Sequence, residues 1–201
     1  MATQTTIEPI DYVPTIFDFS PLRLTDEQFE NLCRNHPDLN LEMSATGELI
    51  IVPPTSPESG WKNSRLTRRM DEWTEKDNTG ICFDSSTMFT LPNGAKRSPD
   101  VSWITKEKWE DLSSSERRKF SRVVPDFVIE LLSPSDNIAD TRLKMEEYIK
   151  NGLRLGWLID PENKTVHVYR ADGEIEILDN PEKVSGEDVL QGFELNVREI
   201  W

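Results

Sequence analysis

The sequence predicts an α/β (mixed α+β) fold, in which a central mixed β-sheet is flanked by helices. The segment VVPDFVIELLS is a nearly continuous apolar run, which is typical of a strand buried on both faces. Apolar residues recur near helical spacing over residues 60–76, and a second helix is predicted over 137–151, ending at Gly152. Short β-rich segments separated by turn residues surround these helices.

An N-terminal helix and a β-hairpin are expected to extend this core. Thr25 can cap a helix that carries Phe29 on its apolar face. LNLEM and ELIIV are separated by SATG, which predicts a hairpin with Gly47 in the turn. Ser56 or Ser59 can cap the next helix, and the remaining strands are predicted in the segments ICFDSSTMFTLP, PDVSWI, WLID, TVHVY and EIEIL.

Length and composition indicate one domain of a cytoplasmic protein. Residues 1–20 are polar and contain proline, so we expect a flexible arm there and a single domain over residues 21–201. No leader and no membrane-spanning segment is indicated. Cys33 and Cys82 are expected to be reduced thiols, because they are far apart and lack metal-ligand spacing.

The charge distribution limits the ways in which the chain could bind nucleic acid. A net charge of −14 argues against a general nucleic-acid coat protein, because phosphate binding needs positive charge. Lys62, Arg65, Arg68 and Arg69 nevertheless form a local basic strip that could follow a phosphate backbone. An ordinary solvated helix face explains the same strip equally well.

Two acidic residues stand where charge is costly. Glu130 interrupts the apolar strand VIELL, and Asp100 follows Pro99 at the start of another strand. A buried carboxylate needs a partner, and residues on adjacent strands, about 4.8 Å apart, can share one Mg²⁺. Asp126 lies four residues before Glu130, about 13 Å along the strand, which is too far for one ion. Structural roles at strand ends are the alternative for both acids.

The segments SPDVSWI, PDFVIELLSPSD, KMEEYIKNG and LGWLIDP resemble the Uma-two family of restriction-endonuclease-like proteins, within the PD-(D/E)xK nuclease superfamily. The resemblance extends from LNLEM to the C-terminus and includes LPNGAKRSPD and GFEL. It implies a restriction-endonuclease-like core for residues 21–201.

The resemblance also implies site residues. Asp100 matches the aspartate of the PD motif, and Glu130 matches the acid of the second half-motif. The lysine expected two positions later is absent, because Leu132 stands there, and Lys144 on the next helix is the migrated candidate. Glu58 is the candidate for the additional helix glutamate of the superfamily, with Glu42 and Glu48 on the hairpin as weaker ones.

These residues imply an Mg²⁺-dependent endonuclease, with Mn²⁺ as a possible substitute, that hydrolyses phosphodiester bonds of nucleic acid, with DNA as the expected substrate. Asp100 and Glu130 are the expected metal ligands, Lys144 and Glu58 complete the catalytic set, and a homodimer would let two sites act on two strands. Two alternatives remain open. The chain could be a catalytically inactive binding or assembly module with a nuclease fold, or a metal-dependent hydrolase of another substrate.

Overall fold

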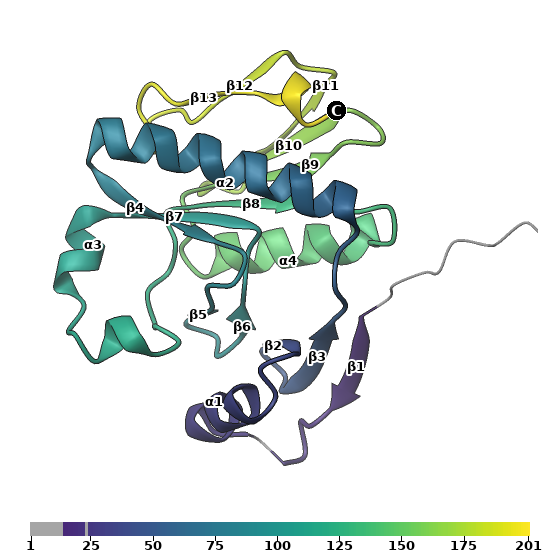
Figure 1. Cartoon of the computed structure of the whole chain (residues 1–201), viewed down its shortest axis with the longest axis vertical. Helices are drawn as coiled ribbons and strands as arrows, with labels where there is room; N and C mark the ends of the chain where they lie inside the picture. The colour runs from purple at the N-terminus through teal and green to yellow at the C-terminus, as the bar shows by residue number, and fades with distance from the viewer. Residues whose placement is uncertain (1–13, 23) are drawn as a thin grey trace, which may run out of the picture.

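The computed structural model describes residues 14–22 and 24–201, and within these ranges the centre of the fold is a six-stranded mixed sheet (Figure 1). Its strand order is β11-β10-β9-β8-β7-β4. β8 and β9 are parallel, because α4 crosses between them, and the other neighbours in this sheet are antiparallel. The strands are β4 (Gly80–Asp84), β7 (Val101–Thr105), β8 (Phe127–Leu131), β9 (Leu155–Asp160), β10 (Thr165–Arg170) and β11 (Ile175–Asp179).

The prediction for the VIELL segment is confirmed, because every residue of β8 is buried and β8 lies between β9 and β7. α2 (Pro57–Asp77) covers one face of the sheet and α4 (Ile138–Lys150) covers the other, as Figure 1 shows. Ser56 caps α2, and Asn137 caps α4. The apolar core is therefore divided by the sheet, with Leu66 and Met70 of α2 on one side and Met145 and Tyr148 of α4 on the other.

A second sheet carries the predicted hairpin. Among the residues described, its strands follow the order β1-β3-β2-β6-β5. Phe29 of α1 (Asp26–Asn35) packs against Leu41 and Leu49 of the hairpin, and Thr25 caps α1 as predicted. Gly47 has φ +94°, which a turn glycine adopts without strain. The strands are β1 (Thr15–Asp18), β2 (Asn40–Met43), β3 (Glu48–Val52), β5 (Phe89–Thr90) and β6 (Lys96–Arg97).

The N-terminus differs from the prediction of an arm over residues 1–20. Residues 1–13 lie outside the described ranges, whereas Thr15–Asp18 form β1, which pairs with β3. The backbone hydrogen bonds of the hairpin edge extend to this segment, although its four side chains are exposed.

The other elements complete the two layers. α3 (Lys106–Asp111) and the 3₁₀ turn η1 (Glu116–Arg118) follow β7 in the chain. β12 (Lys183–Ser185), β13 (Glu194–Asn196) and the 3₁₀ turn η2 (Val197–Glu199), which the sequence analysis does not predict, pack on the α2 side of the main sheet.

Both cysteines, Cys33 and Cys82, are free thiols, as predicted. In the part of the chain that the structure describes, every helix is too short or too polar to cross a membrane.

Gly80 at the start of β4 tests the packing of α2, β4 and β7. A Cβ at this position would stand 2.1 Å from Trp103 and 2.3 Å from the Ile104 carbonyl oxygen. We expect Gly80→Ala to lower the free energy of unfolding by about 2–3 kcal/mol, because a backbone atom cannot move aside cheaply. Gly60→Ala is the control, because its Cβ would meet only Thr55 at 3.7 Å and helical alanine is favoured by about 0.5–1 kcal/mol. Urea unfolding of both variants measures this, and equal stabilities would contradict the packing.

Candidate active site

The strand register brings Asp100 and Glu130 to the same end of the main sheet. Val101 of β7 is paired with Ile129 of β8, and Asp100 and Glu130 are the next residues outward along the two segments. Asp100 precedes β7 and contacts Asn63 of α2, whereas Glu130 contacts Lys144 and Tyr148 of α4, so different helices hold the two side chains. The charge of Asp100 contributes to the raised pKa of Glu130, so the two acids are neighbours, and their role as metal ligands stays a prediction.

Glu130 is the acid at the centre of the cluster and is only 6% exposed. Its Oε1 atom accepts a hydrogen bond of 2.9 Å from the Tyr148 hydroxyl and stands 2.9 Å from the Lys144 ammonium. Burial raises the pKa of Glu130 to about 7; Lys144 opposes this rise, and the nearby carboxylates of Asp100 and Glu42 add to it. Oε2 accepts no hydrogen bond from any side chain or backbone group of the described ranges.

Asp100 is held by two donors from opposite sides. Asn63 of α2 donates from Nδ2 to Oδ1 at 2.7 Å, and the Leu131 backbone N–H donates to Oδ2 at 2.8 Å. Burial raises the pKa of Asp100, against the effects of the Leu131 N–H and the Lys144 charge. The carboxylate is thus oriented, and each of its oxygens keeps a lone pair for another partner.

Lys144 extends from α4 into the same cluster. Its ammonium lies 2.9 Å from Glu130 Oε1 and 3.0 Å from Glu42 Oε1, and its side chain is 20% exposed. Burial would lower the pKa of Lys144, but the two glutamates outweigh burial and raise it, so Lys144 is a permanent cation. An ammonium has three N–H donors, so one remains for a group that enters from solvent.

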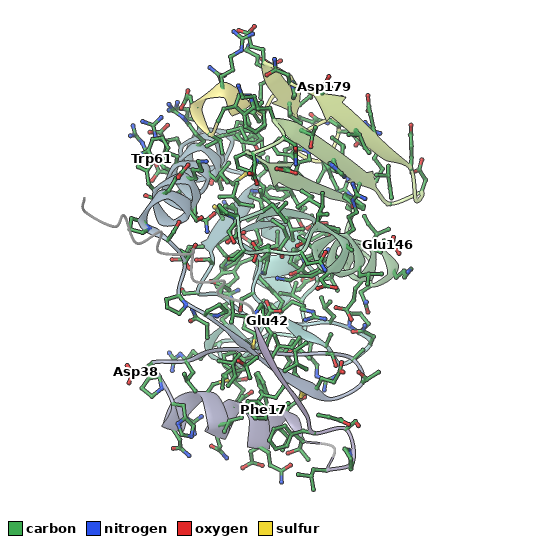
Figure 2. All side chains as sticks on the ribbon, turned by 90° about the vertical axis from the view of Figure 1, so that its right-hand side faces the viewer. Phe17, Asp38, Glu42, Trp61, Glu146 and Asp179 are labelled. Atoms are coloured by element: carbon green, nitrogen blue, oxygen red, sulfur yellow. The ribbon has the colours of Figure 1, made fainter. Side chains whose placement is uncertain are left out.

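Glu42 on β2 belongs to this cluster, although the sequence analysis gives it a weak rank. Arg97 donates to Oε2 at 3.1 Å, and the Ser98 N–H donates to Oε1 at 3.0 Å. Burial would raise the pKa of Glu42, but Lys144 and Arg97 more than offset it and the pKa is lowered. Figure 2 shows Glu42, at the part of the second sheet nearest the main sheet, at a level between Phe17 of β1 and Glu146 of α4. A glutamate between the apolar residues Leu41 and Met43 was the available sequence signal, the same signal that identified Glu130.

The donor set of the cluster fits a divalent cation such as Mg²⁺. The cluster contains four carboxylates and two cationic side chains, so its formal charge is −2. The carboxylates belong to Glu42, Asp100, Glu130 and Glu147, and the cations to Lys144 and Arg97. Mg²⁺ takes hard oxygen ligands and is commonly bound by one or two carboxylates, with water and substrate phosphate completing its shell. Within the described ranges, no three acidic, histidine or cysteine side chains gather closely enough to enclose an ion. Two carboxylates, Asp100 and Glu130, are therefore enough for an Mg²⁺ site of this kind.

Glu58 does not join the cluster. It lies in the first turn of α2, its side chain is 71% exposed, and it forms an ion pair of 2.9 Å with Lys62. The residue of α2 that contacts the site is Asn63. The sequence analysis missed it because an amide on a helix carries no pattern that distinguishes it from a surface residue.

Asp126, at the other end of β8, is a structural acid. It accepts from the Thr105 N–H at 2.9 Å and pairs with Lys108 at 3.0 Å. This agrees with its exclusion on distance along the strand.

The basic strip on α2 is neutralised by acidic neighbours. Lys62 pairs with Glu58, and Arg68 and Arg69 pair with Glu72. Arg65 and Arg69 also reach Glu199 beside the C-terminus, at 3.6 and 2.6 Å. The solvated-face interpretation therefore explains this strip better than an interface for phosphates.

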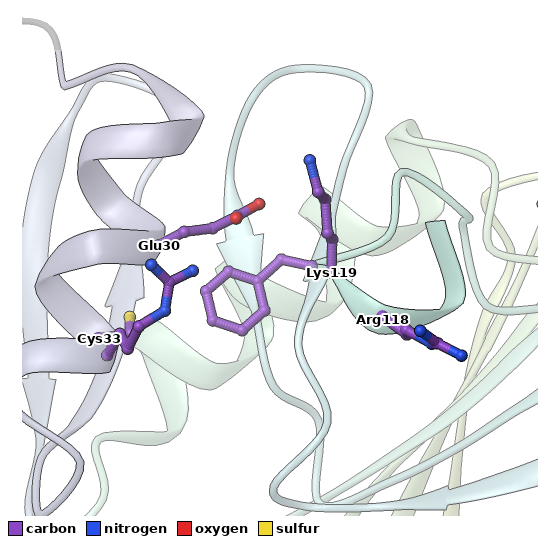
Figure 3. Close-up of a pocket in the computed structure, with 6 residues that line it drawn as sticks. Glu30, Cys33, Arg118 and Lys119 are labelled. Atoms are coloured by element: carbon purple, nitrogen blue, oxygen red, sulfur yellow. The ribbon is translucent and has the colours of Figure 1, made fainter. Parts of the chain in front are cut away.

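A pocket of about 300 Å³ lies elsewhere, between α1 and the segment after η1 (Figure 3). Glu30, Cys33 and Phe120 line it, whereas Arg118 extends away from Cys33 in this view. It contains none of the residues of the carboxylate–lysine cluster, and its cationic side chains do not converge on one point.

A mixed sheet with helices on both faces, carrying two neighbouring carboxylates and a lysine at one end, is typical of the restriction-endonuclease-like class of proteins. The chain belongs to the Uma2 family, described as "Putative restriction endonuclease", whose model matches residues 26–198. This membership supports a nuclease function. No curated protein sequence matches the chain.

A solved structure has the same fold. It is a putative nuclease belonging to DUF820 from Anabaena variabilis, with a TM-score of 0.72 and 23% sequence identity. The match covers 88% of this chain and 97% of the Anabaena chain. The restriction-endonuclease-like fold predicted from the sequence is thereby confirmed.

The raised pKa of Glu130 predicts a pH-dependent stability in metal-free buffer. Between the ordinary glutamate pKa of 4.5 and about 7, the unfolded chain releases this proton while the folded protein retains it. The folded state then binds more protons, so this group lowers the free energy of unfolding as pH rises through that window, by about 3 kcal/mol in total. We expect the stability of Glu130→Gln relative to wild type to increase by this amount from pH 4.5 to 7.5. Urea unfolding with a chelator present measures it, and a difference that does not vary with pH would contradict the shift.

Proposed function

We propose that this protein is a divalent metal-dependent endonuclease that hydrolyses phosphodiester bonds of DNA, with Mg²⁺ or Mn²⁺ held by Asp100 and Glu130. The observation that carries the proposal is the strand register that sets these two carboxylates at the same end of the main sheet, with Lys144 bound to one of them. Family membership supports nuclease chemistry.

The chain's own residues would prepare the reaction. When bound, the ion supplies positive charge that polarises the scissile phosphate and makes a water more acidic. Glu130 Oε2 and the remaining lone pairs of Asp100 would hold it. Lys144 would use its third N–H to orient the attacking water or to stabilise negative charge that grows on the phosphate. Glu42, kept ionised by Arg97 and Lys144, would hold the ammonium in place.

The negative net charge limits which groups of the protein can attract a phosphate. With a net charge of −14 and a neutralised strip on α2, the attraction for phosphate would come from Lys144 and the bound ion. A homodimer would let two such sites cut both strands of a duplex. Exposed Ile16 and Phe17 on the edge strand β1 offer one contact surface for a second copy.

Cleavage of single-stranded, duplex and branched DNA in the presence of Mn²⁺ or Mg²⁺ tests the proposal. We expect Asp100→Asn, Glu130→Gln and Lys144→Met each to lose at least about 100-fold in rate, because each removes a charge that acts at the reacting phosphate. Lys150→Met is the matched control, because Lys150 lies on the same helix and its side chain is 72% exposed. This variant should cleave DNA as fast as wild type does. If wild type cleaves DNA no faster than Asp100→Asn does, the chain is better explained as a catalytically inactive binding module.

A further inference from the structure

Asn63 carries a buried oxygen atom whose presence the fold alone does not explain. Its Oδ1 atom is buried and has no hydrogen-bond partner among the described residues. An unsatisfied buried carbonyl is destabilising, and native structures normally supply a partner, an ordered water or an ion. Asn63 lies in the interior of α2, between the buried residues Lys62 and Leu66, where solvent does not reach this atom.

The orientation of this amide is determined by its neighbour. Nδ2 donates to Asp100 Oδ1 at 2.7 Å, so exchanging the two ends of the amide would set one oxygen against another. With Asp100 ionised, as metal binding requires, the amide has one stable orientation. Because the two amide atoms share a carbon, Oδ1 lies beside the donor that contacts Asp100 and is close to the Oδ1 side of that carboxylate.

We propose that Asn63 is a third oxygen donor of the metal site, and that its amide Oδ1 binds the divalent ion held by Asp100 and Glu130, directly or through one water of the ion's shell. This inference rests on the proposed function and adds a residue to it. Amide carbonyl oxygens are ordinary ligands for hard divalent cations, and groups that support the first ligands commonly contribute 10- to 100-fold in affinity. The neutral amide would occupy the place for which the exposed Glu58 was the sequence candidate.

The amide has two ends, and substitutions can separate them. Asn63→Ala removes both the donor to Asp100 and the oxygen. Asn63→His keeps an N–H donor for Asp100 and has no carbonyl oxygen. If Asn63 only orients Asp100 through Nδ2, Asn63→His should bind Mg²⁺ as wild type does, whereas Asn63→Ala should bind it more weakly. If Oδ1 binds the ion, both variants should lose affinity, because Mg²⁺ prefers oxygen ligands.

Calorimetric titration with Mn²⁺ and Mg²⁺, in the absence of DNA, tests this in the full chain. We expect Asn63→Ala and Asn63→His each to lose at least about 10-fold in Mg²⁺ affinity. The rise in melting temperature at a fixed Mg²⁺ concentration should be smaller for both variants than for wild type, because an ion that binds the folded state less tightly stabilises it less. Ser64→Ala, at an exposed position next to Asn63, is the matched control and should bind as wild type does.

The outcomes separate this inference from the proposed function. Wild-type Mg²⁺ affinity in Asn63→His, or in both Asn63 variants, overturns the role of Oδ1 and leaves the function standing. Metal binding with the expected order of affinities but without DNA cleavage supports Asn63 and removes the endonuclease. A wild-type protein that binds no divalent ion overturns both.

Discussion

The ammonium of Lys144 between Glu130 and Glu42 is the interaction on which the site depends. Glu130 belongs to the main sheet, Glu42 to the second sheet and Lys144 to α4, so one cation joins three parts of the fold. Two carboxylates buried this close together would repel each other strongly, and the cation between them converts that repulsion into attraction. Arg97 extends the network, because it binds Glu42 at 3.1 Å and Glu147 of α4 at 2.7 Å. The position of the second sheet against the main sheet is therefore coupled to the charge state of the site.

The same network gives chemically identical side chains different properties. Glu42 has two cationic neighbours and a backbone N–H, and its pKa is lowered in spite of burial. Glu130 shares one cation and faces two other acids, and its pKa is raised to about 7. Glu42 is thus a fixed anion that holds Lys144, whereas Glu130 would gain most from a further positive charge. Environment, rather than residue type, divides the supporting acid from the candidate ligand.

The candidate site was partly predictable because some of its residues have local signatures. Glu130 interrupts an apolar strand and Asp100 precedes another, and the spacing of neighbouring strands made them partners. Lys144 came from the family resemblance, since its surroundings in the helix carry no distinguishing pattern. Asn63 lies 37 positions from Asp100 in the chain and Glu42 lies 56 positions from Ser98, and only the packing of α2 and β2 brings these two residues to the site. Glu58 had the right residue type, but its turn of α2 directs it to solvent.

Local patterns in the sequence determined the nature of most elements: the buried β8, the capped helices α1, α2 and α4, and the hairpin with Gly47 in its turn. These follow from periodicity, capping and turn chemistry, which act over a few residues. The tertiary structure decided that Thr15–Asp18 extend the second sheet and that β12 and β13 cover the α2 side of the main sheet. It also decided that residues from α2, β2, β8 and α4 share one charged cluster. Such choices depend on free energies of burial and ion pairing between segments distant in sequence, and no short window of sequence contains both partners.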